Sequence, residues 1–371
     1  MSLTTFFSGA LSARHIVQLI ELGKLPRIKT KEFPKNQTSL RDFILTRTDI
    51  TRHLSSLNLS ASKLVTTEKI TIQEKRLETD GSNALFYVPS PDNDKKIVVL
   101  ITHGMGHSPV HFHKLAMLLA KRGITCVCHS LPGHHGSTPL RRKEFTKFGI
   151  EDYSINNGKK LIELARLFQD KAVFAFGHSM GGCTSLRGIT ILDQFLPANV
   201  KGAILLSTTL NIETPLRLTR PVIRCFGSNI DKLVSHYPFG FSRKGAFHAF
   251  FNGEFYDGFT KRDLEYFYEG YQKESFFSGL NLLMSVTPFR LIPPLAFNFK
   301  VNIQALPVLN MMGEEDRLIP MKAGKDVGHL LTKLGSLVSN EIIPGAPHDS
   351  MLTHPEKIAD HIINWLTTRG Y

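Results

Sequence analysis

Short apolar runs alternate with longer segments of helical periodicity through much of the chain. The candidate strands are the apolar runs at 97–102, 124–128, 172–176 and 202–207. The candidate helices lie at 112–122, 155–168 and 183–192, where apolar residues recur at helical spacing. Strands that alternate with helices are typical of βαβ units, so the pattern predicts a mostly parallel sheet flanked by helices.

A hairpin precedes this alternating region. The segments 70–73 and 84–88 each carry strand-forming residues, and they flank the turn sequence Asp80-Gly81-Ser82-Asn83. Gly and Asn next to Asp and Ser favour a tight connection between antiparallel strands. We therefore expect two antiparallel strands to join the edge of the parallel sheet.

The alternation stops after Thr209 and resumes at residue 307. The later elements are a strand at 307–312, a helix near 321–335, a short strand at 341–343 and a helix near 355–367. One domain with an insertion explains this order better than two consecutive domains. We predict a core formed by 66–208 and 305–371, with 209–304 as a cap above it.

Residues 1–65 lack clear strands but repeat apolar side chains at helical spacing. These residues are Phe6, Phe7, Leu11, Ile16, Leu19 and Ile20. The pattern predicts an N-terminal helical extension. A helix at a membrane surface is one interpretation. A helix packed on its own domain is favoured, because the polar face holds few cations.

Charge and cysteine usage narrow the class of protein. The 371 residues carry a formal net charge of +13, but Lys and Arg are scattered, and their densest run is Arg141-Arg142-Lys143. This scatter argues against nucleic-acid binding and leaves contact with an anionic membrane surface open.

The four cysteines form no zinc-binding pattern and no disulfide framework. With no signal-peptide pattern and no apolar run of membrane-spanning length, we expect a cytoplasmic protein with reduced thiols.

The sequence Gly177-His178-Ser179-Met180-Gly181-Gly182 lies where an apolar strand ends and a helix begins. A G-x-S-x-G turn in that position holds its serine on a strained elbow above the sheet, and the glycines allow neighbouring backbone to approach. A simple glycine-rich turn is the alternative. The context of strand and helix makes Ser179 a candidate nucleophile.

A serine nucleophile needs a histidine to accept its proton and an acid to orient that histidine. In this topology the acid and the histidine follow the serine in that order. Asp316 lies in a loop after the strand at 307–312, and His348 lies in a loop after the next strand. We predict Asp316 as the acid, with Glu314 and Glu315 as rivals or a surface salt bridge as its ordinary role. His348 is the predicted base.

Two backbone N–H groups are needed to stabilise the oxyanion formed in acyl transfer. Met180 follows the candidate nucleophile and begins a helix, where the helix dipole favours negative charge. The second donor is expected from the loop 103–107 after the first parallel strand. The Met105 N–H is the best candidate in that loop.

These motifs resemble the serine hydrolases of the α/β-hydrolase fold, and most of all the monoacylglycerol lipase and lysophospholipase group. The resemblance rests on the segments 103–108, 132–137, 177–182, 313–320 and 344–348, and it spans roughly residues 68–371. It implies Ser179, Asp316 and His348 as a catalytic triad and Met105 and Met180 as oxyanion donors. It implies no cofactor and no metal.

The sequence departs from this family's pattern at Ser130, at His135 and in the length of the insertion. Ser130 stands where the family usually has an Asp at a strand end, and an extra His135 lengthens the following turn. The insertion is also long for a monoacylglycerol lipase lid.

Several histidines cluster near these turns: His103, His107, His111, His113, His129, His134 and His135. Their spacing matches no distinctive zinc motif. We expect none of them to be needed for the chemistry, and we expect His178 to be a packing residue.

Aromatic residues are concentrated in the insertion, especially between 247 and 277. Their spacings predict helices with one apolar stripe, which could form the cap's own core or the wall of an acyl pocket.

The predicted activity is carboxylic-ester hydrolysis of an acylglycerol or lysophospholipid-like lipid. An acyltransferase, a thioesterase, a peptidase and a non-catalytic ligand-binding protein remain alternatives on the same fold.

Overall fold

The computed structural model describes residues 64–66, 70–134, 136–137, 140–145, 148–208, 242–272, 274–275 and 305–371. The predicted helical pattern before residue 64 lies outside these residues, as do Cys225, His135 and most of the insertion. No helix in the described part combines the length and the apolar character needed to cross a membrane.

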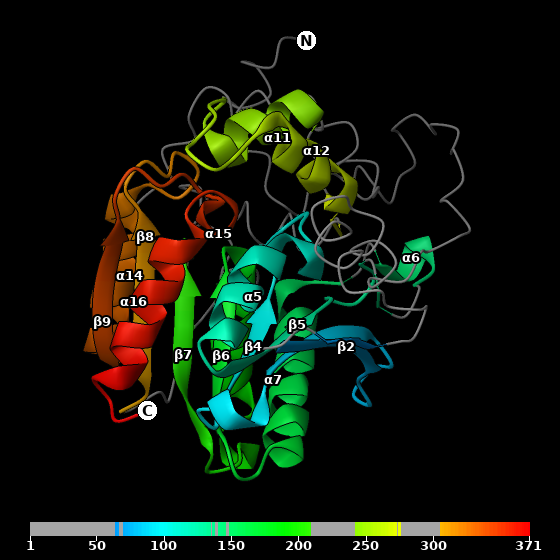
Figure 1. Cartoon of the computed structure of the whole chain (residues 1–371), viewed down its shortest axis with the longest axis vertical. Coiled ribbons are helices and arrows are strands. Elements are labelled where there is room, and N and C mark those ends of the chain that lie inside the picture. The colour runs from blue at the N-terminus through cyan, green and yellow to red at the C-terminus, as the bar shows by residue number, and fades with distance from the viewer. Residues whose placement is uncertain are drawn as a thin grey trace, which may run out of the picture.

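One nine-stranded sheet runs through the described structure (Figure 1). Its strands are β1 (Leu64–Thr66), β2 (Ile70–Arg76), β3 (Asn83–Pro89), β4 (Ile97–Thr102), β5 (Ile124–His129), β6 (Ala172–His178), β7 (Val200–Leu206), β8 (Pro307–Gly313) and β9 (Leu337–Ile343). Their order is β1-β2-β3-β5-β4-β6-β7-β8-β9. Each of β1, β2 and β3 runs antiparallel to its neighbours in the sheet. Strands β4 to β9 are parallel to one another. The predicted hairpin and mostly parallel sheet are confirmed.

Helices cover this sheet. They are α5 (His113–Lys121), α6 (Arg142–Phe145), α7 (Ile150–Leu167), α8 (Met180–Ile191), α14 (Met321–Lys333), α15 (Ser350–Thr353) and α16 (Pro355–Thr367), with 3₁₀ turns at η1 (Pro91–Asn93), η2 (Pro109–Phe112) and η3 (Asp193–Phe195). Helix α5 packs beside α16, α7 packs beside α8, and α14 packs on β8 and β9. Figure 1 shows α5 and α16 on the side of the sheet that faces the viewer.

The central strands are buried along their whole length. All six residues of β4 and all six of β5 are buried, which explains their continuous apolar sequence. Cys126 and Cys128 lie in β5 as free thiols without exposed surface. Burial raises the pKa of the Cys128 thiol far above its ordinary value, with a smaller contribution from Cys126. Both thiols therefore act as core side chains.

Two predicted boundaries are wrong for identifiable reasons. Helix α7 begins at Ile150, before the predicted start at residue 155, because Asp152 accepts a hydrogen bond from the Gly149 N–H at 2.8 Å. Strand β9 begins at Leu337, before the predicted start at 341. It lies at the edge of the sheet and only its last residue is buried, so its apolar pattern is weak.

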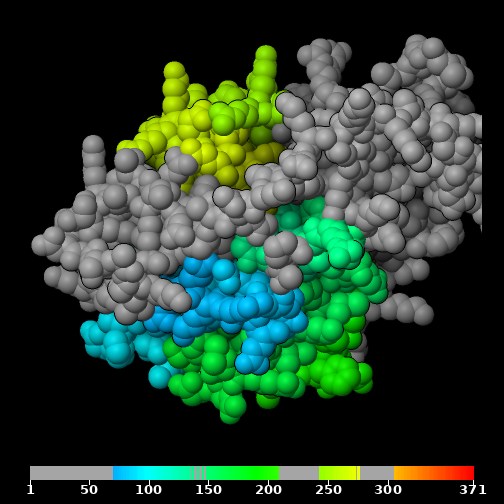
Figure 2. Space-filling model, turned by 90° about the vertical axis from the view of Figure 1, so that its right-hand side faces the viewer, coloured from blue at the N-terminus to red at the C-terminus, as the bar shows by residue number. Residues whose placement is uncertain are grey.

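Two helices of the insertion, α11 (Arg243–Phe251) and α12 (Lys261–Gly270), lie above the carboxyl ends of the parallel strands (Figure 1). The Ser242 hydroxyl caps α11 by accepting from the Gly245 N–H at 3.1 Å, and Thr260 and Asp263 form a capping box at the start of α12. Figure 2 shows these helices in yellow at the top, with the β2–β3 hairpin in blue lower on the same face. The described cap residues therefore stand over the edge where the predicted site lies.

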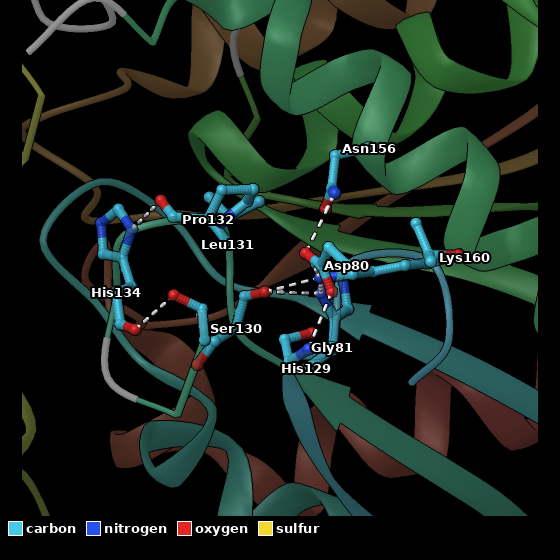
Figure 3. A network of polar contacts seen from close by, with 12 residues as sticks. Asp80, Gly81, His129, Ser130, Leu131, Pro132, His134, Asn156 and Lys160 are labelled. Carbon is cyan, nitrogen blue, oxygen red and sulfur yellow. Dashed lines mark hydrogen bonds and ion pairs between the residues drawn. The ribbon is translucent and has the colours of Figure 1, made fainter. Parts of the chain in front are cut away.

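A buried ion pair joins the hairpin to α7 (Figure 3). The Lys160 ammonium has no exposed surface, and it lies 2.9 Å from an Asp80 carboxylate oxygen and 2.9 Å from the Ser130 carbonyl oxygen. Partial burial opposes ionisation of Asp80, but the charge of Lys160 and hydrogen bonds from Ser82 and Lys160 lower the pKa of Asp80 to about 2. Lys160 thus holds the backbone at Ser130.

We predict that Asp80→Asn lowers the free energy of unfolding by on the order of 3 kcal/mol at pH 7, because it leaves the buried Lys160 charge unpaired. Chemical denaturation of both proteins measures this difference. The pKa of Asp80 is lowered on folding, so the wild-type advantage should be full above about pH 4 and should fade as the pH approaches 2. Asp170→Asn removes an exposed ion pair with Lys96 and should change stability little. Equal effects of the two substitutions would contradict the prediction.

Candidate active site

Ser179 occupies the turn between β6 and α8 with a strained backbone. Its φ of 53° and ψ of −122° lie in a region that residues other than glycine rarely adopt. The Ser179 N–H donates to the Leu206 carbonyl at 2.9 Å, which fixes the turn to the end of β7. The Ser179 side chain lies at the end of the central strand, where only 8% of the residue is exposed.

Close backbone packing explains the glycines around Ser179. A Cβ at Gly177 would overlap the backbone of Gly182, and one at Gly181 would overlap the carbonyl oxygens of Thr102 and His103. Both positions therefore require glycine because β6, α8 and the end of β4 pass so near one another. Strain at Ser179 can be maintained because the surrounding backbone permits no relaxed alternative.

Asp316 and His348 lie side by side although they come from different loops. The His348 Nδ1 is 2.8 Å from the Asp316 Oδ2, and both residues are buried. The other oxygen of Asp316 accepts from the Leu318 and Ile319 N–H groups at 2.9 and 2.7 Å. These bonds fix the carboxylate against His348, so the Nδ1 atom carries the proton.

The two rival acids lie elsewhere. Glu314 and Glu315 are exposed, and the Glu314 carboxylate accepts from the Gly345 N–H at 2.9 Å. The Glu315 carbonyl oxygen accepts a hydrogen bond from the Asn252 side chain at 2.8 Å, which ties this loop to the end of α11. Of the three acidic residues, Asp316 is the one hydrogen-bonded to His348.

The second nitrogen of His348 is free to accept a proton. Its Nε2 atom is buried and has no hydrogen-bond partner among the described residues. Burial disfavours the charged ring, but the charge and hydrogen bond of Asp316, aided by the charge of Asp349, outweigh it and raise the pKa of His348. His178, next to Ser179, lies 3.1 Å from the His348 carbonyl oxygen through its Nε2 atom, and the two rings are 4.8 Å apart. His348 therefore packs directly against the residue preceding Ser179.

The loop after β4 is held by its own histidines. The Gly104 carbonyl accepts from the His103 Nδ1 at 2.9 Å and from the His107 backbone N–H at 3.2 Å. That carbonyl belongs to the same planar peptide as the Met105 N–H, and in a trans peptide the two groups point in opposite directions. Two hydrogen bonds on one side of this peptide thus set the direction of the Met105 N–H on the other.

His103 also connects this loop to the turn after β5. Its Nε2 accepts from the Leu131 N–H at 3.1 Å while its Nδ1 donates to Gly104. Burial lowers the pKa of His103 well below its ordinary value, with a further lowering by His134, so the ring is neutral. A neutral ring with one donor and one acceptor fits these two bonds. His103 thus braces the loop, while the expectation that the histidines outside the triad are not needed for the chemistry stays a prediction.

Met105 and Met180 both lie beside Ser179. A Cβ at Gly104 would lie 3.0 Å from the Ser179 Cβ, so the Met105 peptide packs directly on the serine. Met180 is the first residue of α8, whose opening N–H groups have no acceptor within the helix. The loop after β4 and the start of α8 thus border Ser179 together.

The cap contacts the loops that carry these residues. The Phe250 carbonyl of α11 accepts from the Asp349 N–H at 3.1 Å, and the Phe250 ring stacks on His348 with 5.9 Å between centroids. The Phe267 carbonyl of α12 is 3.0 Å from the His111 Nε2. Each cap helix is thus joined to a different catalytic-face loop.

Much of the aromatic stretch forms the core of the cap. Phe251, Phe259 and Phe267 are at most 2% exposed, and Phe251 stacks on Phe259 with 4.6 Å between centroids. Phe250 differs because it contacts His348. Phe277 lies outside the described residues. Phe251, Phe259 and Phe267 therefore belong to the cap's own core.

A second buried histidine–carboxylate contact joins core and cap. The His134 Nε2 lies 3.1 Å from the Glu274 carboxylate, which also accepts from the Tyr153 hydroxyl at 2.9 Å. Burial opposes ionisation of Glu274, but His134 and the neighbouring donors lower its pKa. His134 lies in the turn after β5, as Figure 3 shows. This contact fixes residue 274 of the insertion to the core.

Among the described residues, His107, His178 and Asp349 bring three metal-ligating atoms within 4.8 Å of one another. Hydrogen bonds already occupy these groups. His107 contacts the Met105 carbonyl through Nδ1 and Asp349 through Nε2, each at 2.8 Å, and the His178 Nε2 contacts the His348 carbonyl. The arrangement fits a proton held between His107 and Asp349 better than an ion.

Comparison with known proteins places the chain in a family. The model of the Alpha/beta hydrolase family matches residues 98–361. The chain belongs to this family, which agrees with its sheet order and with the position of the Ser179 turn. A curated relative, "Uncharacterized hydrolase YugF" of Bacillus subtilis (strain 168), is 24% identical over 309 residues, which cover 79% of this chain and 97% of the relative.

Solved structures share the fold at lower identity. The 2-hydroxy-6-oxo-6-phenylhexa-2,4-dienoate hydrolase of Rhodococcus sp. strain RHA1 has a TM-score of 0.56 at 17% identity, covering 80% of this chain and 99% of its own. The monoacylglycerol lipase of Paleococcus ferrophilus has a TM-score of 0.50 at 19% identity, covering 73% of this chain and 94% of its own. At these identities the similarity establishes the α/β-hydrolase fold.

Proposed function

We propose that the protein is a serine hydrolase that cleaves carboxylic esters through an acyl-enzyme. The observation that carries this proposal is the buried hydrogen bond between Asp316 and His348, which leaves the His348 Nε2 free beside the strained turn of Ser179. Membership of the alpha/beta hydrolase family supports it. Ser179 is the nucleophile, His348 the base and Asp316 the residue that orients the base.

In the proposed reaction, the Ser179 Oγ attacks the ester carbonyl carbon while the His348 Nε2 accepts its proton. The Met105 and Met180 N–H groups stabilise the negative charge that develops on the carbonyl oxygen. His348 then returns the proton to the leaving alcohol, and the Ser179 acyl-enzyme remains. A water molecule, deprotonated by His348, attacks the acyl carbon. The bond from that carbon to the Ser179 Oγ then breaks, His348 returns the proton to this oxygen, and the acid is released. These steps move only protons and an acyl group, so this chemistry needs no cofactor or metal.

We propose a lipid ester, an acylglycerol or a lysophospholipid, as the substrate. Support comes from the sequence motifs shared with the monoacylglycerol lipase and lysophospholipase group and from the apolar cap over the site. Phe250 reaches the base from this cap, which we take to comprise residues 209–304. The net charge of +13 suits contact with an anionic lipid surface. An acyltransferase differs only in replacing water with an alcohol, and product analysis separates the two.

We predict that Ser179→Ala lowers ester hydrolysis by 10³-fold or more, by analogy with other triads. The substitution removes the nucleophilic oxygen and little buried surface, so circular dichroism and the thermal midpoint should stay close to wild type. Labelling with a fluorophosphonate probe should also disappear. A variant that keeps a tenth of the wild-type rate would exclude Ser179 as the nucleophile, and a wild type that resists the probe would favour a non-catalytic binding protein.

We predict that Asp316→Asn lowers the rate by about 10³ to 10⁴, because the amide favours the wrong tautomer of His348. The pKa of His348 is raised above its ordinary 6.5, so kcat/KM in the wild type should rise with pH through a midpoint above 6.5. Residual activity of Asp316→Asn should show that midpoint at lower pH. Glu315→Gln is the matched control and should leave rate and midpoint near wild type. A comparable loss of activity in Glu315→Gln would overturn the assignment of Asp316 as the acid.

We predict that kcat/KM rises from acetyl and butyryl esters to medium and long acyl chains. Each buried methylene contributes about 0.8 kcal/mol, so even partial enclosure of the chain by the cap gives a measurable preference. A series of esters with one alcohol and increasing acyl length measures it, with Ser179→Ala as the background for each ester. A flat profile would contradict the lipid substrate while leaving the serine hydrolase assignment intact.

A further inference from the structure

Asp349 places a second buried carboxylate directly after the proposed base. The residue has no exposed surface, and its Oδ2 lies 2.8 Å from the His107 Nε2. Within the described part of the chain, its other oxygen has no hydrogen bond, and it lies 3.8 Å from the His178 Nε2. A carboxylate buried in this way is costly unless a positive charge or a proton accompanies it.

His107 faces that carboxylate. Its Nδ1 lies 2.8 Å from the Met105 carbonyl oxygen, and its Nε2 lies 2.8 Å from the Asp349 Oδ2. A carbonyl oxygen only accepts hydrogen bonds, so the Nδ1 of His107 donates to Met105, and a second proton lies between its Nε2 and the Asp349 carboxyl group. The two side chains therefore form a buried hydrogen-bonded pair, enclosed between the loop after β4 and the start of α15.

This pair connects the two halves of the proposed catalytic machinery. On one side, the His107 ring holds the Met105 carbonyl while the His107 N–H holds the Gly104 carbonyl. These two carbonyls flank the Met105 N–H that is proposed to bind the oxyanion. On the other side, Asp349 is covalently joined to His348, and its N–H is fixed by the Phe250 carbonyl of the cap. Met105 and His348 are otherwise far apart in the chain.

We propose that His107 and Asp349 form a positioning pair, whose hydrogen bond fixes the oxyanion-binding peptide of Met105 relative to the base His348. The proposal rests on the serine hydrolase function proposed above. Neither residue is assigned a bond to the substrate. Loss of either partner should displace both the base and the oxyanion donor from their shared geometry, and displacements of this kind strongly reduce the rate of acyl transfer.

Asp349 also acts on His348 through charge. Among the described residues, the titratable groups that face His348 are Asp316, Asp349 and His178, while α11 presents the uncharged Phe250. The charge of Asp349 contributes to the raised pKa of His348. Removing Asp349 should therefore move the titration of the base to lower pH.

The test measures the second-order rate of fluorophosphonate labelling of the full chain against pH, which needs no knowledge of the substrate. The proteins are wild type, His107→Gln, Asp349→Asn, the double variant and His111→Gln. His111 is a matched control, because it is buried in the same loop region and its ring lies 5.1 Å from His107, yet it bonds the Ser108 N–H and the Phe267 carbonyl. Circular dichroism and thermal unfolding establish that each variant is folded.

Each single substitution should slow labelling by about 10- to 100-fold, and the double variant should be little slower than the worse single variant. The midpoint of the pH profile should fall in Asp349→Asn and stay unchanged in His111→Gln. Independent losses that multiply in the double variant, or an unshifted midpoint in Asp349→Asn, would overturn the positioning pair, while labelling of the wild type would leave the proposed serine hydrolase function in place. Absence of labelling in wild type would instead refute the proposed function.

A measurement on the wild type keeps the proposal testable if a variant does not fold. Proton NMR spectra of the wild type should include a downfield histidine N–H resonance, from the proton between His107 and Asp349, that is absent from whichever of the two single variants is folded. A wild-type spectrum without any resonance that these substitutions remove would overturn the pair. Stoichiometric metal in the purified protein, lost on either substitution, would also overturn it.

Discussion

The backbone at Ser179, with its positive φ of 53°, is the constraint around which the rest of the site is arranged. The chain must leave β6, expose one side chain and enter α8 within a single residue. This is feasible because Gly177 and Gly181 let β6, α8 and the end of β4 approach to backbone contact, and because Gly182 leaves room for the Thr208 side chain. The same close approach brings the loop after β4 onto Ser179, so the strain and the placement of the Met105 peptide have one physical cause.

Buried polar contacts tie the cap to this arrangement. Asp349 donates to the Phe250 carbonyl, Asn252 donates to the Glu315 carbonyl, and His134 faces Glu274. Each group would lose a partner if the cap moved away, and an unpaired buried polar group is costly. The cap helices are therefore held in a defined position over the site. This favours a cap that shapes the substrate pocket together with the loops it contacts.

The histidines around the site differ in their hydrogen-bond partners. His103 is neutral, since it faces one donor and one acceptor. His107 lies between the Met105 carbonyl oxygen and the Asp349 carboxyl group. Among the described residues, His348 has Asp316 as a partner on Nδ1 and no partner on Nε2, which is the arrangement that the proposed base requires. One residue type thus occupies three different hydrogen-bonding environments around the site.

Sequence alone determined the fold class, most element positions and the residues worth testing. Continuous apolar runs identify the buried strands β4 to β8, because a parallel strand covered on both faces has no polar alternation. The glycine pattern marks the Ser179 turn, since few other sequences can make it. The exposed edge strand β9 and the start of α7 were misplaced, because edge burial and a cap at Asp152 leave little periodic signal.

Tertiary structure decided which side chains meet. Local sequence could not separate Asp316 from Glu314 and Glu315, because only the folded loop shows which carboxylate reaches His348. It also gave no sign that His107 meets Asp349, since 242 positions separate them along the chain. Periodicity reports burial and local conformation, whereas a pair of this kind depends on the relative placement of two loops. That placement is set by the whole sheet.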